Sequence, residues 1–170
     1  MADAYKYSHH KLYYPGTTEV YSYLESRGGK FNNTVFFGLQ YFIKEYLINQ
    51  FDSLFFQQPK DKVLKAYARR IDNYLGKDSI TYKHISDLYD LGYLPLEIKA
   101  LPEGSKVPMR VPCLTIVNTL PEFYWITNFL ETILSAIIWQ PCTSATIAYQ
   151  YRKILNRYAE ETGVPMEFVQ

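Results

Sequence analysis

Residues 93–163 carry the clearest structural pattern in the chain. They read YLPLEIKALPEG (93–104), then CLTIVNT (113–119), then PEFYWITNFLETILSAIIWQPCTSATIAYQYRKILNRYAEETG (121–163). Apolar and polar side chains alternate in PLEIKAL and again through Leu114 and Ile116, which predicts two half-buried strands. Pro102-Glu103-Gly104 between them is typical of a turn. The apolar period then becomes four, which predicts a helix whose buried face holds Trp125, Phe129, Ile133 and Ile137.

Two prolines frame this helix. Pro121 suits its first turn, and Pro141 predicts a break or a kink. A second helix should follow, capped by Thr143 or Ser144 and closed by Gly163. Its predicted buried side consists of Ile147, Tyr151, Ile154, Leu155 and Tyr158.

The proline also sets the expected domain boundary. We expect an N-terminal α/β domain over residues 1–140 and a helix leading away from it over residues 141–170. No interdomain linker, internal repeat or low-complexity tract interrupts the chain.

The first half of the chain mixes strands and helices. Val20–Ser26 alternates like a strand, and Asn33 or Thr34 could cap a helix that runs to Leu47. We expect an aromatic-rich linker over residues 51–59. Helices should follow over residues 60–75 and 79–91, ended by Gly76 and Gly92. Because strands and helices do not alternate strictly, the predicted fold class is α+β.

Composition excludes several classes of function. Hydrophobic residues make up 48% of the chain and charged residues 21%, as in an ordinary globular domain. The net charge of +1 argues against a polyanionic partner, and we expect no nucleic acid binding. The densest basic cluster, Lys60 to Arg70, fits the solvated face of a helix. The high tyrosine count fits a core and a subunit interface.

The remaining composition favours a cytoplasmic protein. Cys113 and Cys142 form neither a metal-binding spacing nor a CxxC pair, so both should be reduced and buried. We expect no signal peptide, because Asp3 and Lys6 interrupt the start. The longest apolar helix contains Glu131 and other polar residues, so no membrane span is predicted.

The literal sequence adds a family resemblance. LPLEIKALPEG, NTLPEFYWITNFLETIL and TSATIAYQYRKIL resemble the N-terminal part of nicotinamide phosphoribosyltransferases, and DAYKYSHHKLYYPGTTEVYSYLESR resembles the opening segment of the same family. The matches occur in the family's order and cover nearly all of the chain, more loosely between Asn49 and Tyr93. The resemblance implies the N-terminal mixed α/β domain of a type II phosphoribosyltransferase, without the β/α barrel that follows it in complete enzymes.

The resemblance also implies three substrate-binding residues. In this family an aspartate and a tyrosine that match Asp3 and Tyr5 reach across a homodimer, and the tyrosine stacks on nicotinamide. A family arginine that matches Arg27 holds the phosphates of phosphoribosyl pyrophosphate, for which a guanidinium fork is well suited. Without the resemblance, residues 3–6 would be interpreted as a frayed terminus and Arg27 as a surface residue.

No catalytic residue and no metal ligand is expected in the chain. His9, His10 and His84 do not match the family's catalytic histidine, so we interpret them as structural or surface groups. Glu131, on a mostly apolar helix, should have a partner, because an unpaired buried carboxylate is costly.

The implied reaction joins nicotinamide to phosphoribose, giving nicotinamide mononucleotide and pyrophosphate, a salvage step toward NAD. Mg²⁺ and ATP are implied for the complete enzyme, but neither is expected on this chain, which should be inactive alone. Its expected partner is a second copy or the missing barrel half. Two alternatives remain: a nicotinate phosphoribosyltransferase fragment, or a non-catalytic dimerisation or interaction module.

Overall fold

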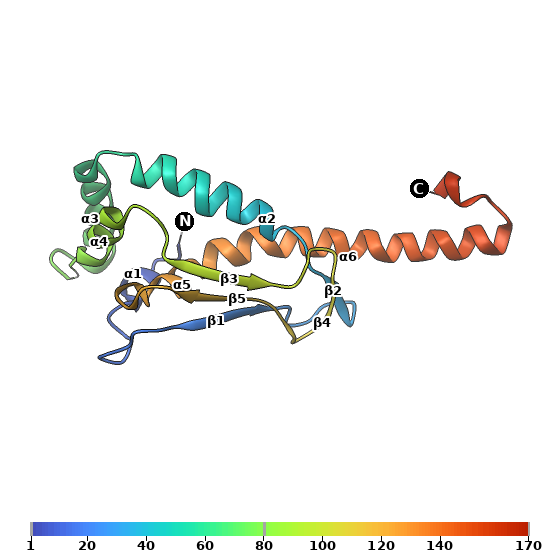
Figure 1. Ribbon diagram of the computed structural model, residues 1–170, viewed down its shortest axis with the longest axis horizontal. Coiled ribbons are helices and arrows are strands. Elements are labelled where there is room, and N and C mark those ends of the chain that lie inside the picture. The colour runs from blue at the N-terminus through green and yellow to red at the C-terminus, as the bar shows by residue number, and fades with distance from the viewer. Residues whose placement is uncertain (1, 80, 170) are drawn as a thin grey trace.

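An antiparallel three-stranded sheet lies at the centre of the computed structural model, which describes residues 2–79 and 81–169. Strand β5 (Pro112–Asn118) is central, with β1 (Tyr21–Glu25) and β3 (Leu96–Ala100) on either side of it. Helices lie along this sheet and gather at one end of it (Figure 1), and this mixture of helices and strands confirms the predicted α+β class.

The register of the sheet explains the alternation in the sequence. Ser22 and Ile98 both pair with Ile116, which is buried. Because successive strand residues point to opposite faces, Tyr21 and Tyr23 lie on the other face, where both are exposed. All three strands therefore confirm the sequence-based prediction.

A second, two-stranded sheet was not predicted. It pairs β2 (Asn33–Val35) with β4 (Lys106–Pro108). The prediction that Asn33 or Thr34 caps a helix is therefore wrong. Thr34 pairs with Val107 in the ladder, and its hydroxyl contacts the Thr146 hydroxyl at 3.2 Å in the interior.

The following helix begins later than predicted and continues further. It starts with α2 (Leu39–Tyr41) and continues as the π-helical segments η1 (Phe42–Gln50) and η2 (Asp52–Phe56). The predicted linker over residues 51–59 is therefore largely wrong. Its phenylalanines stay helical because Phe51, Phe55 and Phe56 pack against the hydrophobic core.

Four helices gather at one end of the sheet (Figure 1). They are α1 (Lys6–His9), α3 (Lys60–Leu75), α4 (Lys83–Leu91) and α5 (Ile126–Phe129). The predictions of α3 and α4 are confirmed, although α4 begins four residues after the expected position. Gly76 and Gly92 end these two helices as predicted.

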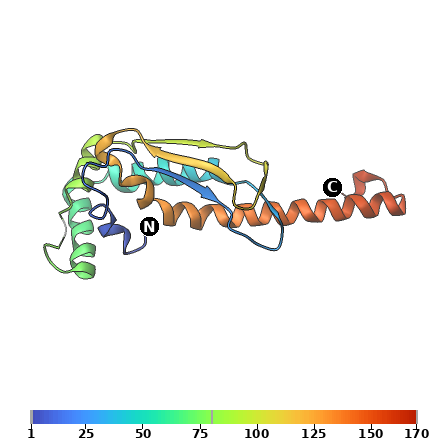
Figure 2. The same ribbon diagram turned by 90° about the horizontal axis from the view of Figure 1, so that it is seen from below.

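The longest element, α6 (Glu131–Thr162), runs beneath the sheet and far beyond it (Figures 1 and 2). It contains Pro141, so the predicted break at this residue, and the caps at Thr143 or Ser144, are wrong. The backbone at Gly38 approaches α6 closely at this proline, since a β-carbon on Gly38 would lie 2.9 Å from the Pro141 Cβ. The predicted division at residue 140 falls inside this helix and stays a prediction.

The distal half of α6 does not bury the face that the sequence predicts. Ile147, Tyr151, Ile154, Leu155 and Tyr158 are all exposed. The reason is that this half extends past the sheet (Figure 2), and the short helix η4 (Met166–Val169) folds back on its end. Gly163 ends α6 in a left-handed conformation, as predicted.

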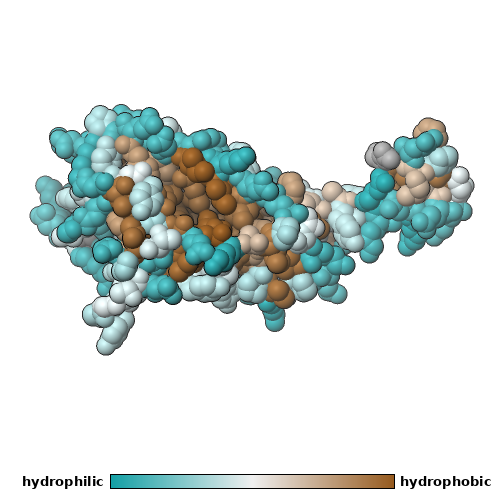
Figure 3. Space-filling model, viewed as in Figure 1, coloured by the Kyte–Doolittle hydropathy of each residue, from teal (hydrophilic) through white to brown (hydrophobic). Residues whose placement is uncertain are grey.

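The hydrophobic core joins the sheet to the first half of α6. Its central contributors are Leu114 of β5, Phe36 and Phe42 near α2, and Ile138 of α6. On the face seen in Figure 3, apolar side chains also gather at the surface, where η1 and β3 line a hollow. The turn η3 (Pro121–Phe123) closes one end of the core with Phe123. Among the described residues, no helix is both long enough and apolar enough to cross a membrane.

Candidate functional site: a cleft between the β1 loop and α6

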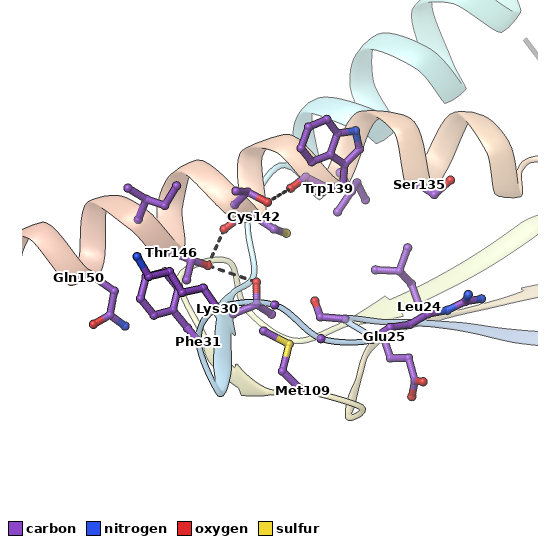
Figure 4. Close-up of a pocket in the computed structure, with 18 of the residues that line it drawn as sticks. Leu24, Glu25, Lys30, Phe31, Met109, Ser135, Trp139, Cys142, Thr146 and Gln150 are labelled. Carbon is purple, nitrogen blue, oxygen red and sulfur yellow. Dashed lines mark hydrogen bonds between the residues drawn. The ribbon is translucent and has the colours of Figure 1, made fainter.

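A cleft of about 940 Å³ lies between the loop that follows β1 and the middle of α6 (Figure 4). Residues 24–31 form one wall, and Met109 lies at its base. The opposite wall is one stripe of α6 with a repeat of about four residues. The stripe consists of Ser135, Trp139, Thr143, Ile147, Tyr151 and Ile154.

Arg27 is one of the residues that line this cleft. It lies two residues beyond the end of β1, and its side chain is exposed. The backbone beside it is fixed, because the Arg110 N–H donates a 2.8 Å hydrogen bond to the Ser26 carbonyl. Within the described residues, neither a hydrogen bond nor an ion pair engages the Arg27 guanidinium, so its donors can reach a ligand.

The charges around Arg27 suit an anion. Lys30 lines the same cleft and Glu25 is the single carboxylate in its lining. A guanidinium donates two parallel hydrogen bonds to phosphate oxygens. Gly28 and Gly29 belong to this loop, but a β-carbon on Gly28 would meet nothing within 4 Å. The geometry therefore does not require a glycine at Gly28.

The stripe on α6 was missed as a binding surface in the sequence. Its distal members were predicted, but as a buried face. The helical period alone could not distinguish these roles, since both a core face and a cleft wall repeat every three to four residues. The polar residues Ser135 and Thr143 of this stripe, and Gln150 beside it, were the available signal for a solvated wall. Ser135 and Gln150 are labelled in Figure 4.

The α6 wall is fixed to the β2 strand by a buried threonine. Thr146 accepts a 2.8 Å hydrogen bond from the Val35 N–H. Its own hydroxyl donates to the Cys142 carbonyl at 2.6 Å (Figure 4). Cys142 adds a weak contact, since its thiol donates to the Phe37 carbonyl at 3.3 Å. These bonds hold the cleft wall in one register relative to the loop.

Asp3 and Tyr5 are not part of this cleft. They lie at the N-terminus of α6, where the Thr132 hydroxyl donates a 2.9 Å hydrogen bond to the Asp3 carboxylate. Tyr5 is 46% exposed and its ring centre lies 4.9 Å from that of His9. The structure therefore brings Asp3 and Tyr5 together and places Arg27 elsewhere along α6.

The N-terminal segment is anchored rather than frayed. Tyr7 packs edge-on against Tyr67 and Phe129, with ring centres 5.6 and 6.1 Å away. Tyr13 accepts a 2.8 Å hydrogen bond from the Asn128 side chain. These contacts, together with those of Asp3 and Lys6 to the start of α6, do not fit the frayed terminus that the residues alone would suggest.

His10 and His84 stack on each other, a contact that fits the structural role expected of them. Their ring centres lie 3.9 Å apart, and Trp125 meets His84 edge-on at 4.9 Å. Burial, together with the neighbouring His10, lowers the pKa of His84 to about 3. Burial likewise lowers the pKa of His10. Both rings are therefore neutral at pH 7.

Glu131 has the partner that its position requires. Its carboxylate accepts a hydrogen bond from the buried Lys6 ammonium, across 125 positions of sequence. The two cysteines are free and buried, as predicted. Burial raises the pKa of Cys113 to about 11 and also raises that of Cys142, which disfavours the reactive thiolate.

Comparison with known proteins decides the family. Residues 1–98 match the family model described as nicotinamide phosphoribosyltransferase, N-terminal domain. The chain belongs to the nicotinamide phosphoribosyltransferase family. It is 47% identical to the nicotinamide phosphoribosyltransferase of Acinetobacter baylyi over 98% of its own length, and 33% identical to that of Xanthomonas campestris pv. campestris over 95%.

The chain spans only about a third of these relatives. It covers 35% of the Acinetobacter protein and 32% of the Xanthomonas protein. Among solved structures, it resembles human nicotinic acid phosphoribosyltransferase with a TM-score of 0.67, over 91% of this chain and 28% of that one. At 21% identity this likeness supports the fold alone, whereas the sequence relatives favour the nicotinamide family over the nicotinate alternative.

Proposed function

We propose that the chain provides the N-terminal part of an enzyme that converts nicotinamide and phosphoribosyl pyrophosphate into nicotinamide mononucleotide and pyrophosphate. The observation that carries this proposal is the family match over residues 1–98, together with 47% identity to a nicotinamide phosphoribosyltransferase along 98% of the chain. The enzyme would act in the cytoplasm.

Arg27 would bind a phosphate of phosphoribosyl pyrophosphate. Its place in the cleft, its exposed guanidinium and the neighbouring Lys30 support this role. The elongated cleft leaves room for a larger ligand than a single phosphate. The apolar Trp139 and Ile147 on the facing wall would exclude water from one side of that ligand.

Asp3 and Tyr5 would contact nicotinamide in the partner subunit of a homodimer. Their separation from the Arg27 cleft supports an arrangement in which one protomer's residues complete a site of the other. The exposed Tyr5 ring offers an aromatic face, which binds a flat heteroaromatic ring by offset stacking. The positively charged pyridinium of the product would gain a cation–π contribution as well.

Magnesium and ATP would bind a β/α barrel that completes the enzyme. Within residues 2–79 and 81–169, no three His, Cys, Asp or Glu side chains gather in a group that could hold a metal ion. The chain's own part is to bind phosphate and nicotinamide and to orient them.

The exposed apolar residues on the outer half of α6 also favour a second candidate, a module whose main role is to pair with another chain. Ile154, Leu155 and Tyr158 expose about half of their surfaces on the projecting half of the helix. Exposed apolar residues in such a row are typical of an interface. The same surface would serve a barrel half, so activity distinguishes the two candidates.

A complementation assay tests the proposal. The 170-residue chain is mixed with the remaining part of the Acinetobacter relative, and nicotinamide mononucleotide is measured with Mg²⁺ and ATP present. We call this mixture the complemented enzyme. We expect product from the complemented enzyme and none from either part alone. Product from the isolated chain, or a tight complex without any product, would contradict the proposal.

A further inference from the structure

Lys6 is the one charged residue among the buried polar residues of the described chain. Only 2% of its side chain is exposed, whereas 59% of its partner Glu131 is exposed. Burying an ammonium costs more free energy than burying an apolar side chain of similar size, and its partner recovers only part of that cost. A lysine at this position therefore calls for a reason other than stability.

The position of the ammonium relative to Tyr5 provides such a reason. The Lys6 Nζ lies 5.0 Å from the centre of the Tyr5 ring, within the range of a cation–π interaction. His9 makes a tilted contact with the same ring at 4.9 Å. Tyr5 nevertheless keeps 46% of its surface exposed, so these contacts orient the ring without covering it.

The start of α6 holds this arrangement in place. Glu131 is the first residue of the helix, and Thr132 bonds both the carboxylate and the backbone N–H of Asp3. The Leu130 cap provides no side-chain hydrogen bond. The Asp3 carboxylate thus lies near a helix N-terminus, where a negative charge is favourable. Tyr5 lies between Asp3 and Lys6 in sequence, and both of these residues are bonded to the start of α6.

We propose that Lys6 and Glu131 are positioning residues that fix the plane of the Tyr5 ring for stacking on a flat heteroaromatic ligand. This inference rests on the proposed role of Tyr5 in nicotinamide binding. Lys6 approaches the ring and Glu131 holds the ammonium there. Neither side chain needs to touch the ligand.

The test uses E131Q, because loss of the buried Lys6 itself could disturb folding. The matched control is D87N, which removes the carboxylate of an exposed lysine pair, Lys83–Asp87, on α4. In the complemented enzyme, E131Q should raise the KM for nicotinamide about tenfold and change kcat less than twofold, since a misplaced ring weakens ground-state binding. D87N should change neither.

A second readout needs only the 170-residue chain. A single 3-fluorotyrosine at position 5 reports the ring's surroundings by fluorine NMR. E131Q should shift or broaden this resonance, D87N should leave it in place, and E131D should restore it in part.

The two readouts separate the possible failures. An unchanged resonance in folded E131Q overturns the positioning role, whether or not the complemented enzyme is active. A shifted resonance with an unchanged KM also overturns it, because the ring then moves without consequence for binding. If the wild-type mixture makes no product, the proposed function fails, and the resonance alone decides whether Glu131 orients Tyr5.

Discussion

Pro141 lies directly against Gly38, and this contact fixes how the segment before α2 crosses the long helix. A β-carbon on Gly38 would lie 2.9 Å from the Pro141 Cβ and 3.0 Å from its Cγ. Gly38 also has a φ of 99°, a conformation that other residues rarely adopt. The proline ring thus occupies space that only a glycine leaves open.

Replacing Gly38 by alanine should therefore destabilise the chain. We expect a loss of about 2–4 kcal/mol in the free energy of unfolding, since backbone strain adds to overpacking against Pro141. Urea denaturation followed by circular dichroism measures this. The control is G28A, where the added β-carbon meets nothing within 4 Å. Equal stability of the two variants would contradict the account of this contact.

Thr146 should contribute more to stability than a neighbouring threonine with the same helical bond. T146V removes a buried hydroxyl and leaves the Val35 N–H without its acceptor, which should cost about 1–3 kcal/mol. Thr143 donates to the Trp139 carbonyl at 2.8 Å but is exposed. T143V should therefore change the unfolding free energy by less than about 0.5 kcal/mol. Similar losses in both variants would show that burial of Thr146 is unimportant.

The histidine stack should make the chain less stable in acid. The pKa of His84 in the folded chain is about 3, below its ordinary value of 6.5. As pH falls below 6.5, the unfolded state therefore takes up a proton first, and the unfolding free energy decreases until pH approaches 3. Between pH 6.5 and 4.5 this one group should remove about 2 kcal/mol, at up to about 1.4 kcal/mol for each pH unit.

Two variants separate this effect from other acid effects. H84F removes the titrating ring and should flatten the fall in unfolding free energy between pH 6.5 and 4.5. Y67F removes only the hydroxyl that lies 3.2 Å from His84 Nε2 and should keep most of that fall. A fall in H84F as steep as in the wild type would show that His84 is not responsible.

Arg27 should affect phosphoribosyl pyrophosphate more than nicotinamide. In the complemented enzyme, R27A should raise the KM for phosphoribosyl pyrophosphate about tenfold to a hundredfold, because a charge-assisted bond to phosphate is lost. The KM for nicotinamide should change much less. R157A removes an arginine that pairs with Glu161 near the far end of α6 and should change neither value. Equal effects of R27A on both substrates would argue against a phosphate contact.

The exposed apolar residues on the outer half of α6 should matter for binding to the barrel half and not for folding. I154E places a charge on a side chain that is 47% exposed, so the unfolding free energy should change by less than about 0.5 kcal/mol. Binding to the barrel half should nevertheless weaken at least tenfold, since burying that charge at an interface is costly. Calorimetry measures the affinity, and K153E is the control one residue away. Unchanged binding of I154E would exclude Ile154 from the interface.

The sequence predicted what local patterns determine. Alternation located β1, β3 and β5, and periodicity with terminal glycines located α3 and α4. The short β2–β4 pair was missed, because three-residue strands have no measurable period. Pro141 was misjudged because a local pattern shows only that proline disfavours a helix interior, and it cannot show that the backbone at Gly38, about a hundred positions away, packs against this proline in the folded chain.

The candidate site was also predicted only in part. The resemblance named Asp3, Tyr5 and Arg27, but it could not show that Arg27 borders a cleft while Asp3 lies at the start of α6. The partner of Glu131 was expected, and only the fold identified it as Lys6. The assignments of Asp3, Tyr5 and Arg27 to substrates stay predictions.

Because α6 is continuous through Pro141, its two ends belong to one rigid helix. Thirty-two residues at about 1.5 Å each give a length of about 48 Å. Inserting one residue in its middle would rotate the outer end by about 100° relative to the Asp3 anchor. The number of residues between Glu131 and Ile154 therefore sets the distance and the angle between the Tyr5 ring and any chain that binds at Ile154.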